Sequence, residues 1–162
     1  TVLELASSFG ETAIALAKRF GVRVVGVEKN PESIARANNN IRAAGLENQV
    51  KIIEGDIFHL EEIAEQFDYV FAEAILSMQS PPGKAKILKS VCDRLKPGGK
   101  FLSHELLAQN REAEIHQELA RVIRSNTTPL SEPNWKAAFT ENGLQVQQYK
   151  TGAMALLNLK RM

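Results

Sequence analysis

The sequence predicts an α/β fold in which a doubly wound, mostly parallel sheet of seven strands carries helices on both faces. Three observations predict it. Five short apolar runs alternate with helical segments over residues 2–106, as in parallel strands joined by right-handed crossovers. The run 22–28, VRVVGVE, is rich in β-branched residues, which suits a strand covered on both faces. Residues 144–161 hold two strand-like runs divided at Thr151-Gly152, which predicts a C-terminal antiparallel hairpin.

The first half of the chain is expected to alternate strands with helices. A buried strand is predicted at Val2–Leu5, and the helix after it ends in a basic turn before Gly21. In the second helix Asn30 suits the N-cap, Pro31 the first helical position and Gly45 the end. Its apolar face repeats at helical spacing and is formed by Ile34, Ala37, Ile41 and Ala44.

The alternation continues and then changes its rhythm. Strands are expected at 50–55, 68–73 and 100–106, a short helix within 60–66, a helix at about 82–95 ended by KPGGK, and two further helices within 111–125 and 130–143. No linker or internal repeat interrupts the pattern, so residues 1–162 are predicted to form a single domain.

Composition bounds the kind of protein and its partners. With 44% hydrophobic residues and a net charge of +1, the chain is typical of a globular protein and unlike one that binds nucleic acid or an anionic membrane. No apolar run reaches the ~20 residues of a membrane span. The lone Cys92 cannot form an internal disulfide, which favours a cytoplasmic location. Thr1 opens a predicted strand without a preceding methionine, so we expect a native N-terminal segment before it. Assembly as a homodimer is compatible with this composition.

The candidate ligand site lies where the predicted strands end. Ligands of open α/β sheets bind beyond the carboxyl ends of the strands, so these ends are considered together. Acidic or small residues follow all five: Ala6 to Gly10, then Glu28, then Gly55-Asp56-Ile57, then Glu73, then His104-Glu105. Ordered in this way, they predict one ligand site at one edge of the sheet.

Two of these acidic residues have spacing that suits a nucleoside. Glu28 comes eighteen residues after Gly10, close to the ~20 expected for a carboxylate that binds ribose hydroxyls. Asp56 is suited to accept a proton from an adenine amino group, with Ile57 covering the ring. The alternatives are equally plain: Glu28 starts a turn or pairs with Lys29, and Gly-Asp begins a turn.

The order of these motifs resembles the class I S-adenosylmethionine-dependent methyltransferases, a Rossmann-like family. The matching stretches are VLELASSFGETA (2–13), VVGVEKNPESIARANNNI (24–41), VKIIEGDIF (50–58), FDYVFAEAILSM (67–78) and ILKSVCDRLKPGGKFLSHEL (87–106). Each acidic residue alone is a weak signal, but their order and spacing together are specific. The resemblance also implies a terminal antiparallel hairpin.

The resemblance implies that S-adenosyl-L-methionine is the cofactor and assigns residues to it. Glu4, Ala6, Ser7, Ser8 and Gly10 would surround its methionine and ribose end, Glu28 and Lys29 its ribose, Asp56 and Ile57 its adenine, and Glu73 the region near the sulfonium. The family usually has glycine at the positions of Ala6 and Ser8. Each added Cβ restricts the backbone and takes space near the ligand, so the first loop is where this sequence departs from the family pattern.

The resemblance further implies methyl transfer to a small-molecule acceptor. An acidic nucleophile would need a base, for which Glu73, His104 and Glu105 are candidates, and strand alternation predicts that His104 and Glu105 do not both face the site. No aspartate cluster follows the fourth strand, so no metal is expected.

Two other functions stay open. One is a methyltransferase-like domain without catalysis or with weak cofactor binding. The other is an NAD-dependent oxidoreductase, although that class requires G-x-G-x-x-G at the first loop.

Basic residues gather on one predicted helix and on the segment that follows it. We interpret them as a solvated helix face; they are Lys84, Lys86, Lys89, Arg94, Lys96 and Lys100.

Overall fold

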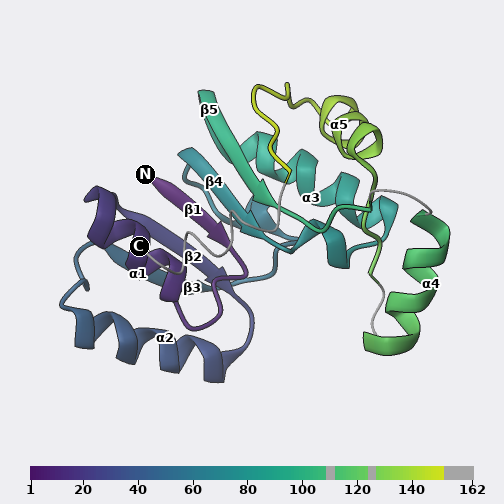
Figure 1. Cartoon of the computed structure of the whole chain (residues 1–162). Coiled ribbons are helices and arrows are strands. Elements are labelled where there is room, and N and C mark those ends of the chain that lie inside the picture. Colours follow the sequence, from purple (N-terminus) through teal and green to yellow (C-terminus); the bar gives the residue numbers. More distant parts are fainter. Residues whose placement is uncertain (109–111, 124–126, 152–162) are drawn as a thin grey trace.

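A computed structural model of the chain describes residues 1–108, 112–123 and 127–151. The five strands of its described part form one parallel sheet in the order β3-β2-β1-β4-β5 (Figure 1). These strands are β1 (Val2–Leu5), β2 (Val24–Glu28), β3 (Val50–Glu54), β4 (Phe67–Glu73) and β5 (Leu95–His104). The alternation of strands and helices predicted from the sequence is therefore confirmed over these elements.

Helices cover both faces of this sheet. On one face lie α1 (Glu11–Phe20) and α2 (Pro31–Ala44), and on the other lie α3 (Pro81–Arg94) and α5 (Glu132–Glu141). The short 3₁₀ helices η1 (Leu60–Glu62) and η2 (Leu76–Met78) follow β3 and β4, and α4 (Glu112–Ile123) projects beyond the sheet (Figure 1). None of the helices in the described ranges has the length and apolarity needed to cross a bilayer.

Local sequence signals set the ends of α2 and α3. The side chain of Asn30 accepts hydrogen bonds from the amides of Glu32 and Ser33, and Gly45 ends α2 in the left-handed region at φ 67°. Ser80 caps α3 by accepting from the amide of Gly83. The predicted cap, first position and end of α2 are thus all confirmed.

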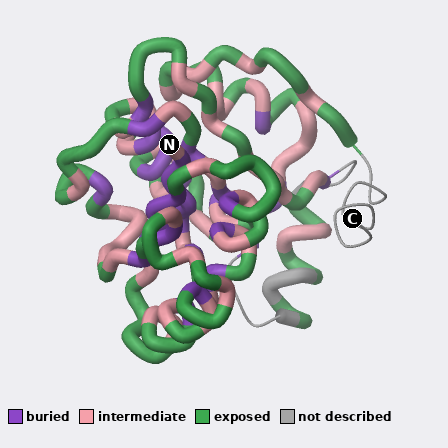
Figure 2. The backbone as a smooth tube through the Cα atoms, turned by 90° about the vertical axis from the view of Figure 1, so that its left-hand side faces the viewer, coloured by how far each residue is buried: buried purple, intermediate pink, exposed green. Residues whose placement is uncertain are grey.

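Two apolar layers, one on each face of the sheet, form the core. Leu3, Val25 and Phe67 pack toward α3 and α5, where Trp135 is also buried, whereas Val2 and its neighbours pack toward α1 and α2. Figure 2 shows the buried residues gathered in the interior of the molecule and exposed residues on the outer turns of the helices. A parallel sheet covered on both faces explains why its strands are nearly continuous apolar runs.

The predicted seven-stranded sheet with a terminal hairpin is wrong in the described part of the chain, which holds five strands. Residues 144–151 form no ladder with the sheet, and the second predicted run, 152–161, lies outside the described residues. Alternating apolar residues predict two faces, but a strand also needs a hydrogen-bonded neighbour, which the pattern does not specify. The fifth strand also starts earlier than predicted, because Leu95 already pairs with Phe67 before a register shift.

Candidate functional site

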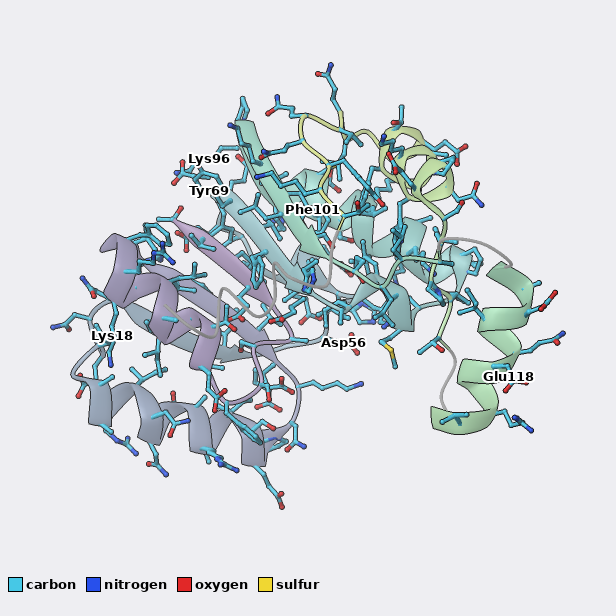
Figure 3. All side chains as sticks on the ribbon, viewed as in Figure 1. Lys18, Asp56, Tyr69, Lys96, Phe101 and Glu118 are labelled. Carbon is cyan, nitrogen blue, oxygen red and sulfur yellow. The ribbon has the colours of Figure 1, made fainter. Side chains whose placement is uncertain are left out.

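The site lies at the carboxyl edge of the sheet, between β1 and β4. The chain runs outward from β1 to β2 and β3 on one side and continues with β4 and β5 on the other, so the connections diverge at this point. Figure 3 shows Asp56 at the carboxyl end of the sheet and Lys96 at the opposite end. A pocket of about 230 Å³ opens at the carboxyl end of β1 and β4. It is lined by Glu4, Leu5, Ala6, Ser7, Ser8, Phe9, Glu11, Thr12 and Glu73.

The loop after β1 has left-handed backbone angles, which favour glycine, at two positions that hold alanine and serine. Ala6 and Ser8 have φ angles of 53° and 48°, and Gly10, the N-cap of α1, has 75°. Each non-glycine residue in the left-handed region costs about 1–2 kcal/mol. Hydrogen bonds hold the loop in this shape, since the amide of Ser7 donates to the carbonyl of Val27 and that of Gly10 to the carbonyl of Ser7, both at 2.9 Å.

Gly26 makes room for this loop from the neighbouring strand. A Cβ at Gly26 would lie 2.5 Å from Ser7 Oγ and 2.6 Å from Ile52 Cδ1. Ser7 is therefore seated directly against the backbone of β2, and its hydroxyl oxygen is buried without a hydrogen-bond partner in the described residues.

Glu28, at the end of β2, connects the loop to the start of α2. Its Oε2 accepts from the amide of Ser8 at 2.9 Å, and its Oε1 accepts from the amides of Lys29 at 3.0 Å and Asn30 at 2.9 Å. A carboxylate has about four acceptor positions, so three are filled and one on Oε2 remains. Lys29 thus takes part through its backbone amide, which donates to Glu28. Glu28 does form a turn, as the alternative interpretation held, and it still has one free acceptor position beside the pocket.

Glu4 and Glu73 place two carboxyl groups in the same pocket. Glu4, on β1, is only 5% exposed, and its Oε2 has no hydrogen-bond partner in the described part of the chain. Burial, and to a smaller extent the charge of Glu73, raises the pKa of Glu4 to about 8, against a smaller lowering by the backbone amide of Ala13. A cation between these groups would be favoured, because it would stabilise the ionised form of Glu4.

Glu73 also faces His104 on the adjacent strand. The two residues are register partners at the carboxyl ends of β4 and β5, and Glu73 Oε1 lies 3.8 Å from His104 Nδ1. Both side chains are about half exposed, at 49% and 44%. This distance is longer than a hydrogen bond, so a proton would pass between the two groups only after a closer approach or through one water molecule.

Asp56 and Ile57 lie in the turn after β3. Asp56 Oδ1 accepts from the amide of Phe58 at 2.9 Å, and the amide of Gly55 donates to the carbonyl of Glu28 at 3.0 Å, which joins this turn to the end of β2. Ile57 is half-buried against the core. The turn alternative for Asp56 is therefore confirmed, and its adenine-binding role stays a prediction.

Glu105 is not among the residues that line this pocket. Both of its carboxylate oxygens accept hydrogen bonds, from Ser103, Leu76 and Ser77, which argues against Glu105 as the base. Lys84 also departs from the predicted solvated helix face, because only 3% of it is exposed.

Two supporting residues were missed in the sequence. From α2, Asn40 donates to the carbonyl of Phe9 at 2.9 Å, and the Arg36 guanidinium lies 4.2 Å from the centre of the Phe9 ring. Their spacing of four residues, which puts them on one helix face, is the signal that could have indicated them. Both buttress the loop from outside the pocket. Within the described ranges, no group of three metal-ligating side chains comes together.

Comparison with known proteins agrees with this arrangement. A family model described as a methyltransferase domain matches residues 1–151. The chain belongs to this methyltransferase family. The resemblance to class I S-adenosylmethionine-dependent methyltransferases is thereby confirmed. This methyltransferase chain is 35% identical to an uncharacterised protein of Haemophilus influenzae, over 99% of the chain and 64% of that protein.

Further relatives show how much of a complete enzyme the methyltransferase chain spans. It is 31% identical over 100 residues to a demethylmenaquinone methyltransferase of Lactobacillus johnsonii, covering 60% of the chain and 40% of that enzyme. The solved structure of a mitomycin 7-O-methyltransferase superposes with a TM-score of 0.79 at 22% identity, covering 94% of the chain and 45% of that protein. The chain thus spans less than two thirds of the relatives it matches.

Proposed function

We propose that this protein transfers a methyl group from S-adenosylmethionine to a small-molecule acceptor. The observation that carries the proposal is the buried Glu4 carboxyl, which has one unpaired oxygen and belongs to a residue that lines a pocket together with Glu73. Burying an unpaired carboxyl costs free energy, and binding of a cationic ligand beside it offsets that cost. S-adenosylmethionine carries an ammonium and a sulfonium against a single carboxylate, so its two cationic groups suit this pair of acids.

The charge of the pocket also argues against the oxidoreductase alternative. Its described lining contains Glu4, Glu11 and Glu73 and no lysine or arginine. A dinucleotide places a pyrophosphate at the first loop, where the carboxylates of Glu11 and Glu73 would oppose it and no cationic side chain would offset them. A ligand with positive charge and without phosphate fits this lining better.

The other predicted residues extend the proposed site along the sheet edge. Glu28 would accept from a ribose hydroxyl at its remaining position, while Asp56 and Ile57 would hold the adenine. The Gly55–Glu28 backbone hydrogen bond supports a continuous surface, because it fixes the two turns relative to each other. The loop with left-handed Ala6 and Ser8 supports retained cofactor binding, since its backbone does not require glycine to reach that shape.

In this proposal the protein aligns the reactants, excludes water and accepts a proton. The cofactor supplies an activated methyl group for in-line displacement. Glu73 and His104, 3.8 Å apart at one side of the pocket, would take the proton of an acceptor whose nucleophile must be deprotonated. A small-molecule acceptor is supported by the near-neutral charge of the chain and by the demethylmenaquinone methyltransferase among its relatives.

Calorimetric titration tests the cofactor. S-adenosylmethionine and S-adenosylhomocysteine are expected to bind, and NAD is not. Glu4→Gln keeps the shape of the side chain but lacks the charge, so it should weaken both adenosyl ligands. Absence of binding by either adenosyl compound at millimolar concentration would contradict the proposal and favour the non-catalytic alternative, and NAD binding alone would favour the oxidoreductase.

The acceptor is tested separately. Metabolites that accumulate when the gene is deleted are supplied to the purified protein with S-adenosylmethionine carrying a labelled methyl group. Transfer of the label to one of them identifies the acceptor. Bound cofactor without transfer to any accumulated metabolite would contradict the catalytic part of the proposal.

A further inference from the structure

The turn after β4 leaves Glu73 in a constrained position. The chain reverses at Ala74, whose φ of 54° is left-handed, and then forms η2. The amide of Ala74 donates to the carbonyl of His104 at 2.7 Å. Because the left-handed region costs a non-glycine residue about 1–2 kcal/mol, contacts beyond the turn must hold Ala74 there.

Glu105 supplies these contacts for the first half of the turn. Its Oε1 accepts from the amide of Leu76 at 3.2 Å and from Ser103 Oγ at 2.6 Å. Its Oε2 accepts from the amide and the hydroxyl of Ser77, at 2.7 and 2.6 Å. These four bonds fill the acceptor positions of one carboxylate. Ser77 is fully buried, and its hydroxyl oxygen also accepts from the amide of Leu106 at 2.8 Å.

Lys84 holds the second half of the same turn. Its buried ammonium donates to the carbonyl of Gln79 at 2.6 Å and to Thr128 Oγ1. The amide of Thr128 in turn donates to the carbonyl of Ser77 at 2.7 Å. Burial lowers the pKa of Lys84 to about 8, while the charge of Glu105 opposes that change. The half-buried carboxylate of Glu105 and the buried ammonium of Lys84 therefore fix residues 76–79 from both ends.

We infer that Glu105 is a positioning residue: by binding the turn at Leu76 and Ser77, it sets the direction of β4 at its end and keeps Glu73 beside His104. The inference rests on the proposed function only in giving Glu73 and His104 a role in methyl transfer. The geometry of the turn itself is independent of any ligand.

Glu105→Gln tests the inference with a side chain of the same shape. Its NH2 group would replace one of the two oxygens and face the amide of Leu76 or Ser77, so at least that hydrogen bond is lost, while a serine hydroxyl can turn to accept. Amide hydrogen exchange at Ala74, Leu76 and Ser77 should accelerate roughly 10-fold or more. The ring signals of His104 in NMR spectra should move, while those of His59, which pairs with Glu61, should not.

The control and the contrary outcomes separate positioning from general stability. Glu47→Gln, at an exposed position, should change none of these signals. If Glu105→Gln accelerates exchange equally at Val25 in the core, or leaves the His104 ring and the three turn amides as in the unmodified protein, the positioning role is overturned.

A second variant keeps the inference testable if Glu105→Gln does not fold. Ser77→Ala removes the hydroxyl that joins Glu105 to Leu106 and should produce the same changes with smaller size. Unchanged turn amides and an unchanged His104 ring would overturn the role here too. S-adenosylhomocysteine titration is run in parallel: failure of the unmodified protein to bind it contradicts the proposed function, whereas the NMR readouts still decide the role of Glu105.

Discussion

Glu73 and His104 face each other because they are register partners at the ends of two adjacent parallel strands, with 3.8 Å between Oε1 and Nδ1. Since both side chains are about half exposed, the pair contributes little to stability. His104→Gln should therefore change the free energy of unfolding by less than about 0.5 kcal/mol. With an acceptor that must be deprotonated, methyl transfer should fall by roughly 10²-fold or more.

Denaturant unfolding followed by the fluorescence of Trp135, the single tryptophan, provides the stability measurement. The transfer assay with labelled S-adenosylmethionine measures the rate of methyl transfer. A His104→Gln protein that unfolds normally and transfers methyl groups at the full rate would exclude His104 from proton transfer.

Glu4 should make stability depend on pH. Its pKa is about 8 in the folded protein against an ordinary value of 4.5, so the folded state binds more protons than the unfolded state between these pH values. The free energy of unfolding should fall by about 4 kcal/mol between about pH 5 and pH 8.5. Glu4→Gln should lack this component and should be the more stable protein at the higher pH. Urea unfolding of both proteins across this range tests the prediction; parallel pH profiles would contradict it.

The loop after β1 should gain stability from glycine. Ala6→Gly and Ser8→Gly each remove left-handed strain, partly offset by the entropy of the unfolded chain, so unfolding should cost about 0.5–1 kcal/mol more. Ala43→Gly, at an exposed helical position, should instead lower the free energy of unfolding by about 1 kcal/mol. Urea midpoints of the three variants test the difference in sign, and destabilisation by all three would refute the strain argument.

Gly26 should resist substitution because of its contact with the loop. In Gly26→Ala the new methyl group meets Ser7 and Ile52, and we expect a loss of about 1–3 kcal/mol. The same change in an Ile52→Val background should cost less, because valine lacks Cδ1. A double-mutant cycle on thermal unfolding measures this coupling, and additive effects would show that Ile52 does not limit the space at Gly26.

Glu28 should affect both ligand binding and stability. Glu28→Gln would place an NH2 donor opposite backbone amides that now donate to the carboxylate. It should weaken the binding of an adenosyl ligand by about 1–3 kcal/mol and lower the free energy of unfolding by about 1 kcal/mol. Glu54→Gln is the matched control, since Glu54 is the exposed register partner of Glu28 on β3. Equal affinities of the two variants for S-adenosylhomocysteine would remove Glu28 from the proposed site.

The sequence by itself determined the alternation of strands and helices and the boundaries of α2. These depend on local properties: the period of apolar residues, the cap at Asn30, the proline after it and the left-handed end at Gly45. It also determined which edge of the sheet carries the acidic residues, because parallel strands all end at the same edge. A ligand site at that edge could therefore be predicted without knowing any contact.

Only the tertiary structure decided what each of these side chains faces. Glu4 is buried beside Glu73, Glu105 binds the turn through Ser77, and Lys84 is buried although its neighbours on α3 suggested a solvated face. Likewise, the alternating run 144–151 could be identified, but its lack of a ladder could not. Burial and pairing depend on which segment packs opposite a residue, and that information lies in distant parts of the chain.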